Sequence, residues 1–206
     1  MQLTDIRTAV RDRIGVSSND GILTDTVLNR LINRAVKTFG SEHHWAWLEK
    51  SDSQSPTTNT VTMPSDWAAT VSVSISGESR PLLWLPIDEF VRHDQANADP
   101  RFYTVYGDAV LVAPHNTAGV SLVHRYIAVE ADLTSDTHEP LCPDHLIEPI
   151  IEFASALAYH QVVDIPLAQR AEDRYERRVQ AYKTAAERQS NTRGGAVSAG
   201  GPYAAE

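Results

Sequence analysis

The sequence contains a single cysteine, Cys142, among its 206 residues. One thiol excludes an intrachain disulfide and any zinc site built from several thiolates. The chain also lacks an apolar run near the roughly 20 residues that a membrane helix requires. Its first residues, MQLTDIRTAVRDR, alternate polar and apolar side chains instead of forming the apolar stretch of a signal peptide. These absences predict a soluble protein suited to a reducing compartment, with no membrane partner.

Positive charge is scarce as well. The chain has 18 Lys and Arg residues against 27 Asp and Glu residues, which gives a formal net charge of −9 at pH 7. Tight wrapping of nucleic acid needs a dense row of cations against the phosphates, and this composition argues against it. An acidic surface instead allows DNA to pass without adhering.

Motifs of the common catalytic classes are absent too: there is no GxSxG elbow, P-loop, HExxH pair or dinucleotide fingerprint. Cys142 and His145 have the spacing of a thiolate–imidazolium pair, but no oxyanion site or orienting group accompanies them. Pro143 between them favours a helix start instead. We therefore predict no catalytic residues, no cofactor-binding residues and no enzyme activity. A hydrolase acting through Cys142 is the alternative.

Two clusters of potential metal ligands are better explained as structural. The Glu-His-His triplet at 42–44 is consecutive, and adjacent residues on a helix point in different directions, so they do not readily share one metal. Asp132, Asp136 and Glu139 lack the spacing and central glycine of an EF-hand. We interpret the triplet as a polar helix end and the acids as turn residues of a linker. No metal site and no cofactor are predicted.

Basic residues recur at helical spacing in two places. Arg30, Arg34 and Lys37 share one face of an expected helix, and the arginines within 170–178 alternate with acids. Neither group has the density of a nucleic-acid-binding stripe. We favour a solvated or intersubunit face, and a DNA-binding module using the Arg30 face stays open as an alternative.

Helical periodicity marks the first 50 residues. Apolar residues recur at helical spacing over 6–14, and more strongly after Thr24, which is placed to cap a second helix that Gly40 ends. Trp45 and Trp47 follow in a short helix or turn, where we expect them to be buried. We assign residues 1–50 to the N-terminal helices of a bundle.

The middle of the chain has the period and composition of β-strands. Over residues 60–129 β-branched residues dominate, and 69–75 alternate apolar with small polar side chains. Two β-rich runs meet at Gly107, as in a hairpin, and a short helix is expected within 86–97. We assign residues 51–131 to a β-rich insert, either a sandwich or a single sheet.

Helical spacing returns after a polar linker. A wide apolar face covers residues 146–162 and includes Pro149, at which the helix either begins or kinks. Pro166 opens a last amphipathic helix that we expect to end at residue 189. We assign 132–189 to the C-terminal helices of the bundle. Residues 190–206 lack periodicity and apolar content, and are assigned to a flexible C-terminal extension.

These segments predict an α+β fold: an antiparallel helical bundle made by the N- and C-terminal helices, a β-rich inserted subdomain and a flexible C-terminal tail. Each terminal helical segment has an apolar face, and packing the faces together is the simplest way to bury both. The residues predicted to form the structural core are Leu28, Leu31, Trp45, Trp47, Ile150 and Leu157.

Several segments, taken in order, resemble phage head-to-tail adaptor (connector) proteins. The run ILTDTVLNRLINRAVKTFGSEHHWAWLE at 22–49 resembles the opening helices of that family, where an LT…LN helix start precedes a tryptophan-rich turn. MPSDW at 63–67 is similar to the family's LP-D step into the β insert, and 100–107 to its P-Y…G segment. The run at 131–159 resembles the linker and long helix that follow.

The resemblance implies a virion structural protein of the phage neck, assembled in the host cytoplasm as a ring, commonly of twelve copies, beneath the portal. Such a ring extends the DNA channel, so that DNA passes through the lumen without specific binding, and docks the tail or a second connector. Some members send a C-terminal extension onto the portal, and the Gly-rich segment 190–206 with its aromatic anchor suits this role. The portal-binding residues predicted here are Arg193, Val197, Pro202 and Tyr203.

Another ring-forming neck or tail protein of the virion is the nearest alternative function, ahead of the nucleic-acid-binding module. The resemblance leaves open the number of copies, the tail-side neighbour and the choice between a long-tailed and a short-tailed phage. We also hypothesise that an acidic lumen avoids contact with the phosphates of DNA.

Overall fold

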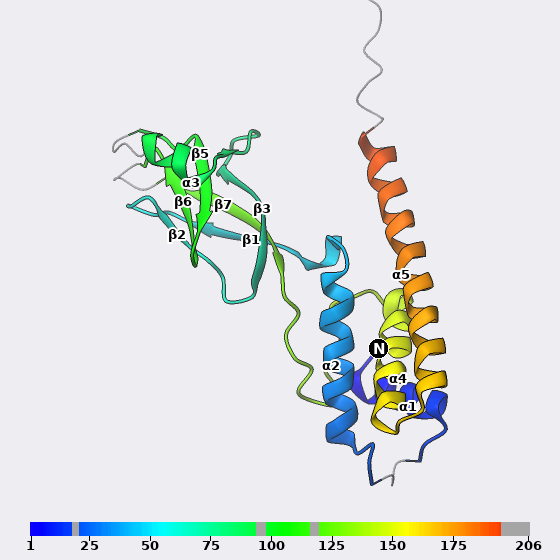
Figure 1. The fold of residues 1–206 in the computed structure, drawn as a ribbon. Coiled ribbons are helices and arrows are strands. Elements are labelled where there is room, and N and C mark those ends of the chain that lie inside the picture. Colours follow the sequence, from blue (N-terminus) through cyan, green and yellow to red (C-terminus); the bar gives the residue numbers. More distant parts are fainter. Residues whose placement is uncertain (18–20, 94–97, 116–119, 195–206) are drawn as a thin grey trace, which may run out of the picture. The chain divides into compact units, whose positions relative to one another are not determined.

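The chain divides into two compact units. Unit 1 comprises residues 1–43 and 132–206, and unit 2 comprises residues 44–131. The predicted α+β class is confirmed, with five α-helices and two β-sheets in the described part of the chain (Figure 1). The computed structural model describes residues 1–17, 21–93, 98–115 and 120–194.

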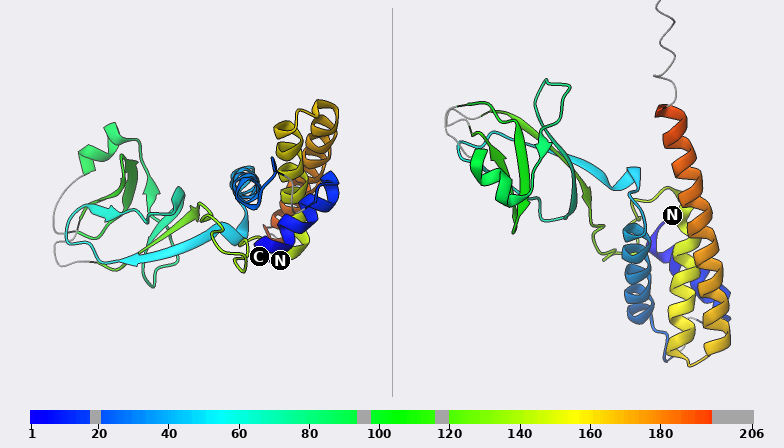
Figure 2. Two further views of the ribbon diagram at one scale, coloured as in Figure 1. Left: turned by 90° about the horizontal axis from the view of Figure 1, so that it is seen from below. Right: turned by 45° about the horizontal axis from the view of Figure 1, so that its top comes forward.

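Unit 1 consists of helices. They are α1 (Leu3–Ile14), α2 (Asp25–Ser41), α4 (Ile147–Gln161) and α5 (Ile165–Gly194). α4 packs against each of the other three and lies between α2 and α5 (Figures 1 and 2). Its sequence suits this central position, because ten of its fifteen residues are buried.

The helix ends follow local chemistry. Thr24 caps α2 as predicted, since its Oγ1 accepts a hydrogen bond from the N–H of Val27. Gly15 ends α1 in the left-handed conformation, at φ 71°. Gly40 does not end α2, which continues to Ser41 and has Glu42 as its C-cap.

The C-terminal helices differ from the prediction at both ends. α4 begins at Ile147, so Pro149 lies in its first turn, where a missing N–H breaks no intrahelical hydrogen bond. α5 continues to Gly194, although the sequence predicted an end at 189. Residues 190–194, assigned to the flexible extension, are therefore helical. Residues 195–206 lie outside the described residues.

Unit 2 contains both sheets. In the first, the strand order is β1-β7-β3, and both strand pairs are antiparallel. In the second, the order is β2-β6-β5-β4, and β4 pairs with β5 in parallel. The strands are β1 (Glu49–Gln54), β2 (Thr60–Thr62), β3 (Trp67–Ile75), β4 (Leu83–Trp84), β5 (Phe102–Tyr106), β6 (Ala109–Ala113) and β7 (Leu122–Ala128).

The two sheets share one hydrophobic core, so the β-rich region is not a single sheet. β5 and β6 form the hairpin predicted at Gly107, whose φ is 59°. α3 (Ile87–Phe90) packs against β5. The buried residues of this core come from both sheets and from the residue before β4: Val61, Val73, Leu82, Tyr103, Val110, Val112 and Leu122.

The strict alternation predicted over 69–75 is interrupted. A register shift between Thr70 and Ser72 breaks the pairing of β3 with β7, and Val71 is 43% exposed while Val73 is buried. An extra residue in one strand turns the following side chains toward the other face of the sheet.

The predicted core residues lie at different depths. Leu28 and Leu31 on α2 are buried, as are Ile150 and Leu157 on α4. Trp45 is also buried, at 3% exposed. The ring of Trp47 stacks on that of Trp45, with centroids 4.6 Å apart, but Trp47 is only half-buried.

Candidate assembly surfaces

An ion-pair cluster joins three helices of unit 1. The side chain of Glu152, on α4, is 4% exposed, and its carboxylate lies 3.2 Å from Arg13 Nη1 on α1 and 3.2 Å from Arg174 Nε on α5. Glu148, one turn earlier, lies 2.8 Å from Arg13 Nη2 and 3.6 Å from Arg178 Nη2. Arg13 on α1 and Arg174 and Arg178 on α5 are therefore paired with carboxylates inside the unit.

A second set of ion pairs fixes the start of the linker to the helices. Arg7 pairs with Asp136 at 3.0 Å and with Asp25 at 3.3 Å. Lys37 Nζ lies 2.7 Å from Asp132 Oδ1. Asp132 and Asp136 thus act as partners of cations, which is a structural role.

One face of α2 differs from this pattern, and we call it the arginine face. It consists of Arg30 and Arg34, both exposed, and neither forms an ion pair with any residue that the structure describes. The face lies on the side of α2 opposite the residues that the helix buries. Those buried residues are Leu28, Leu31, Ile32, Ala35, Val36 and Phe39.

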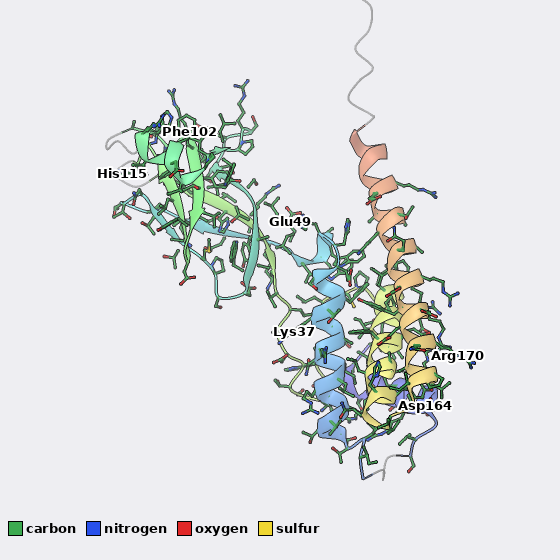
Figure 3. All side chains as sticks on the ribbon, in the orientation of Figure 1. Lys37, Glu49, Phe102, His115, Asp164 and Arg170 are labelled. Atoms are coloured by element: carbon green, nitrogen blue, oxygen red, sulfur yellow. The ribbon has the colours of Figure 1, made fainter. Side chains whose placement is uncertain are left out.

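An open groove of about 600 Å³ runs beside the arginine face. The side chain of Asn33 fixes its wall, because its Nδ2 donates to the carbonyl of Leu133 at 3.1 Å and its Oδ1 accepts from the N–H of Leu133 at 2.7 Å. Figure 3 shows Lys37 on α2 at this side of unit 1. The groove is lined by Arg30, Asn33, Arg34, Lys37, Thr38, Asp132 and Thr134.

A second open groove, of about 490 Å³, lies along α5 and reaches the C-terminal end of α2. Lys183 Nζ lies 2.8 Å from Glu42 Oε2 within it, so these two charges cancel. Glu176 is exposed and forms no ion pair within the described chain. We call this the α5 groove, and it is lined by Glu42, Tyr175, Glu176, Arg177, Val179, Gln180 and Lys183.

Tyr175 occupies an unusual position in the α5 groove. Its ring is buried against Phe153, and its hydroxyl oxygen is buried without a hydrogen-bond partner among the described residues. Burial raises the pKa of Tyr175 well above its usual range, and the negative charges of Glu42 and Glu176 raise it further. The hydroxyl therefore lies in the negative potential of these two carboxylates.

In unit 2, a polar network surrounds a buried histidine. His124 is 1% exposed, and its Nε2 lies 3.0 Å from Thr70 Oγ1, which also accepts a hydrogen bond from Trp67 Nε1 at 3.1 Å. The other ring nitrogen, Nδ1, is buried and has no partner among the described residues. Burial lowers the pKa of His124, and nearby Asp52 opposes the shift.

The outer edge of β2 is protected by a side chain. Gln54 Nε2 donates to the carbonyl of Thr62 at 2.7 Å, and Gln54 Oε1 accepts from the N–H of Thr62 at 3.0 Å. The amide of Gln54 thus makes the two hydrogen bonds that a neighbouring strand would make. Nearby, Lys50 and Tyr126 both donate hydrogen bonds to the carboxylate of Asp66. The bond from Lys50 is the main cause of the lowered pKa of Asp66, and the bond from Tyr126 lowers it further.

The residues considered for chemistry do not converge. Cys142 is buried, whereas His145 is exposed in the short turn just before α4. Among the described residues, no group of three or more His, Cys, Asp and Glu side chains is arranged to hold a metal ion. None of the helices described is long and apolar enough to cross a membrane.

Of the residues predicted to bind the portal, Arg193 lies in the last turns of α5. Val197, Pro202 and Tyr203 lie outside the described residues. Sequence reasoning identified the arginine face through its helical spacing. It missed the α5 groove, because the last helix was expected only to be amphipathic, with arginines that alternate with acids on a solvated or intersubunit face.

Comparison with known proteins adds one finding. The family model of the SU10 adaptor protein matches residues 1–199, which include all of unit 2 and nearly all of unit 1. No curated protein has a significantly similar sequence.

Proposed function

The chain belongs to the SU10 adaptor protein family, a family of phage head-to-tail adaptors, and we propose that it forms a ring beneath the portal of a tailed phage. The family match confirms the resemblance found in the sequence and supports a structural role in the virion, and we propose that the protein is not an enzyme. In the proposed ring, commonly of twelve copies, the subunits extend the DNA channel and dock the tail or a second connector. Assembly takes place in the host cytoplasm.

The observation that carries this proposal is the extent of the match, which spans both units. A partial match would leave room for a separate activity in the unmatched part. We propose that the helices of unit 1 form an antiparallel bundle that is the rigid body of each subunit. The internal ion pairs of Glu152 and Glu148 support this, because they tie α1 and α5 to α4.

Docking on the portal is assigned to the end of the chain. α5 continues to Gly194, so the residues after it leave from the tip of a helix of 30 residues, about 45 Å long at the usual rise. Val197, Pro202 and Tyr203 follow this helix in the sequence, and apolar or aromatic side chains are typical anchors for a pocket on a partner.

The net charge of −9 is consistent with a conduit for DNA. A lumen with the same sign of charge as the phosphates binds DNA weakly and lets it slide. The two arginines that each subunit has on the arginine face are too few for a continuous binding stripe.

The test is a docking experiment with the purified portal of the same phage. Light scattering of the full chain with portal should give a complex larger than the portal alone. A chain truncated after Gly194 keeps α5 complete and should fold normally but dock at least tenfold more weakly; Tyr203→Ala should weaken docking in the same direction. Undiminished docking by the truncated chain would refute the role of the C-terminal segment.

The nearest alternative is another ring-forming protein of the neck or tail. It predicts self-assembly that the portal neither triggers nor stabilises. DNA binding that weakens gradually with rising salt would instead favour the nucleic-acid-binding module, provided that replacement of Arg30 and Arg34 abolishes the binding.

A further inference from the structure

The turn between α4 and α5 carries an exposed apolar surface. Four of the six large apolar side chains that are exposed in the described part of unit 1 lie within its six residues, so they are gathered and not scattered. We propose that the ring docks on its tail-side neighbour through this surface. The inference rests on the proposed adaptor function and names the residues that make the contact. We call the surface the apolar tip, and it consists of Val162, Val163, Ile165 and Leu167.

Local hydrogen bonds hold the apolar tip in one conformation. Asp164 Oδ1 accepts from the N–H of Leu167 at 3.2 Å and so caps the start of α5, where Pro166 also fits the first turn. The hydroxyl of Tyr159 donates to the carbonyl of Arg13 at 3.1 Å, which ties the end of α4 to the end of α1. Side chains that are presented on such a fixed turn lose little further freedom when they bind a partner.

Val163 is the most unfavourable residue of the apolar tip for the stability of the subunit itself. Its φ is 62°, a left-handed conformation that disfavours a β-branched side chain, and the residue is 77% exposed. The side chain therefore adds backbone strain without being buried inside unit 1. Glycine at this position would remove the strain. Strained residues of this kind are found where the side chain serves a function, here contact with a partner.

The chemistry of the apolar tip indicates a protein partner and not DNA. Asp164 is the one charged residue within 162–167, and its carboxylate caps α5. Binding to DNA phosphates needs cations, which this segment lacks. Apolar side chains with few charges are typical of the buried centre of a protein–protein interface. The partner is therefore a protein that offers an apolar groove or pocket.

The position of the apolar tip indicates which partner this is. α5 begins at the tip and continues to Gly194, about 45 Å away at the usual rise of a helix (Figure 1). Figure 3 labels Asp164 at this end of unit 1. The segment assigned to the portal follows Gly194, so it leaves from the opposite end of the helix. A subunit that is held to the portal there has its apolar tip free for the tail or a second connector.

The proposed ring would multiply this contact. Subunits related by rotation about one axis place their apolar tips at one level, in a circle. Four apolar side chains make a small contact in each copy, but contacts that are repeated around a ring bind together with much higher avidity. A substitution that weakens every contact slightly should therefore weaken docking of the whole ring strongly.

The experiment measures portal loading and tail joining separately, with the full chain. Light scattering gives the number of copies on the portal, and electron micrographs then give the fraction of loaded portals that have joined purified tails of the same phage. Val163→Gly and Val163→Asn should load normally, but the tail concentration for half-maximal joining should rise at least tenfold. Val163→Gly should also raise the Tm by about 2–4 °C, because it relieves the strain. Val91→Asn is the matched control, since Val91 is a 65% exposed valine outside the tip, and it should leave both steps unchanged.

A gain in stability together with a loss of tail joining supports the inference, because a residue that serves only the fold would not give both. Normal tail joining by both Val163 variants overturns the inference and leaves the adaptor function standing. Loss of portal loading in these variants also overturns it, and assigns the apolar tip to the portal or to a contact between copies. Loaded wild-type rings that join no tails overturn it as well. A wild-type chain that does not load on the portal defeats the ring proposal itself, and this inference with it.

Discussion

The buried carboxylate of Glu152 determines how firmly three helices of unit 1 are joined. It lies 3.2 Å from Arg13 on α1 and 3.2 Å from Arg174 on α5, and its side chain is 4% exposed. Replacement by Gln keeps the shape of the side chain and removes the charge that both guanidiniums face. Loss of one partner of a buried ion pair costs about 3–5 kcal/mol when the remaining charge stays buried.

The surroundings of the cluster reduce this cost. The side chains of Arg174 and Arg178 are 46% and 43% exposed, so water can hydrate them, and Arg13 keeps Glu148 at 2.8 Å. We therefore expect Glu152→Gln to lower the free energy of unfolding by about 2–3 kcal/mol. For a chain of this size, that corresponds to a fall in Tm of about 4–12 °C.

The assay is urea unfolding followed by circular dichroism at the helical band, which reports mainly on unit 1. Asp173→Asn, an exposed carboxylate on α5 without an ion pair in the described chain, is the control and should change stability by less than about 0.5 kcal/mol. A double-mutant cycle with Arg174→Met should give a coupling of about 1–2 kcal/mol. An unchanged midpoint in Glu152→Gln, or strictly additive effects in the cycle, would refute the role of the cluster.

Four further predictions concern single positions. Burial lowers the pKa of His124 from 6.5, so this histidine takes up a proton in the unfolded chain at a higher pH than in the folded chain. The stability of unit 2 should therefore decrease as the pH falls below about 6.5. In His124→Gln that dependence should disappear from denaturant curves, and a flat wild-type profile would disprove the argument. Gln54→Ala exposes the β2 edge at Thr62 and should cost about 1 kcal/mol and promote aggregation, seen by turbidity. Val163 has φ 62°, which disfavours a β-branched residue, so Val163→Gly should raise stability in a melting experiment by about 1 kcal/mol. Trp45→Ala should cost about 3–5 kcal/mol in urea unfolding, and a loss under about 1 would contradict its burial.

Local chemistry made part of the fold predictable from sequence. The N-cap at Thr24 and the hairpin at Gly107 each depend on a few neighbouring residues, and the structure has both. The buried side of α2 follows directly from its helical spacing. Those features need no knowledge of distant parts of the chain.

Features that depend on distant residues could not be predicted in this way. The partners of Glu152 come from positions 13 and 174, and no spacing rule connects them. The two-residue period of the sequence could not reveal the register shift near Val71, because the shift changes how β3 pairs with β7 and not the composition of β3. α5 continues past 189 through polar residues, since a helix can propagate where an apolar stripe has already ended.

Of the two candidate surfaces, one depends on local sequence and the other on residues that are distant in the sequence. The arginine face is a local pattern on one helix, so its spacing revealed it. That it forms no ion pair with the described residues became clear only when the positions of Asp132 and Asp136 were known. The α5 groove requires α5 and the end of α2 to meet at Glu42 and Lys183. Sequence periodicity contains no information about that meeting.

The most direct test of the central claim is the mass of the complex that the chain forms with the portal of its own phage. Native mass spectrometry or light scattering should show a defined number of copies per portal; twelve copies of a 22.7 kDa chain would add about 270 kDa. A closed complex of constant stoichiometry, reached cooperatively, is what the adaptor account predicts. A chain that remains a stable monomer of 22.7 kDa in the presence of portal would contradict it.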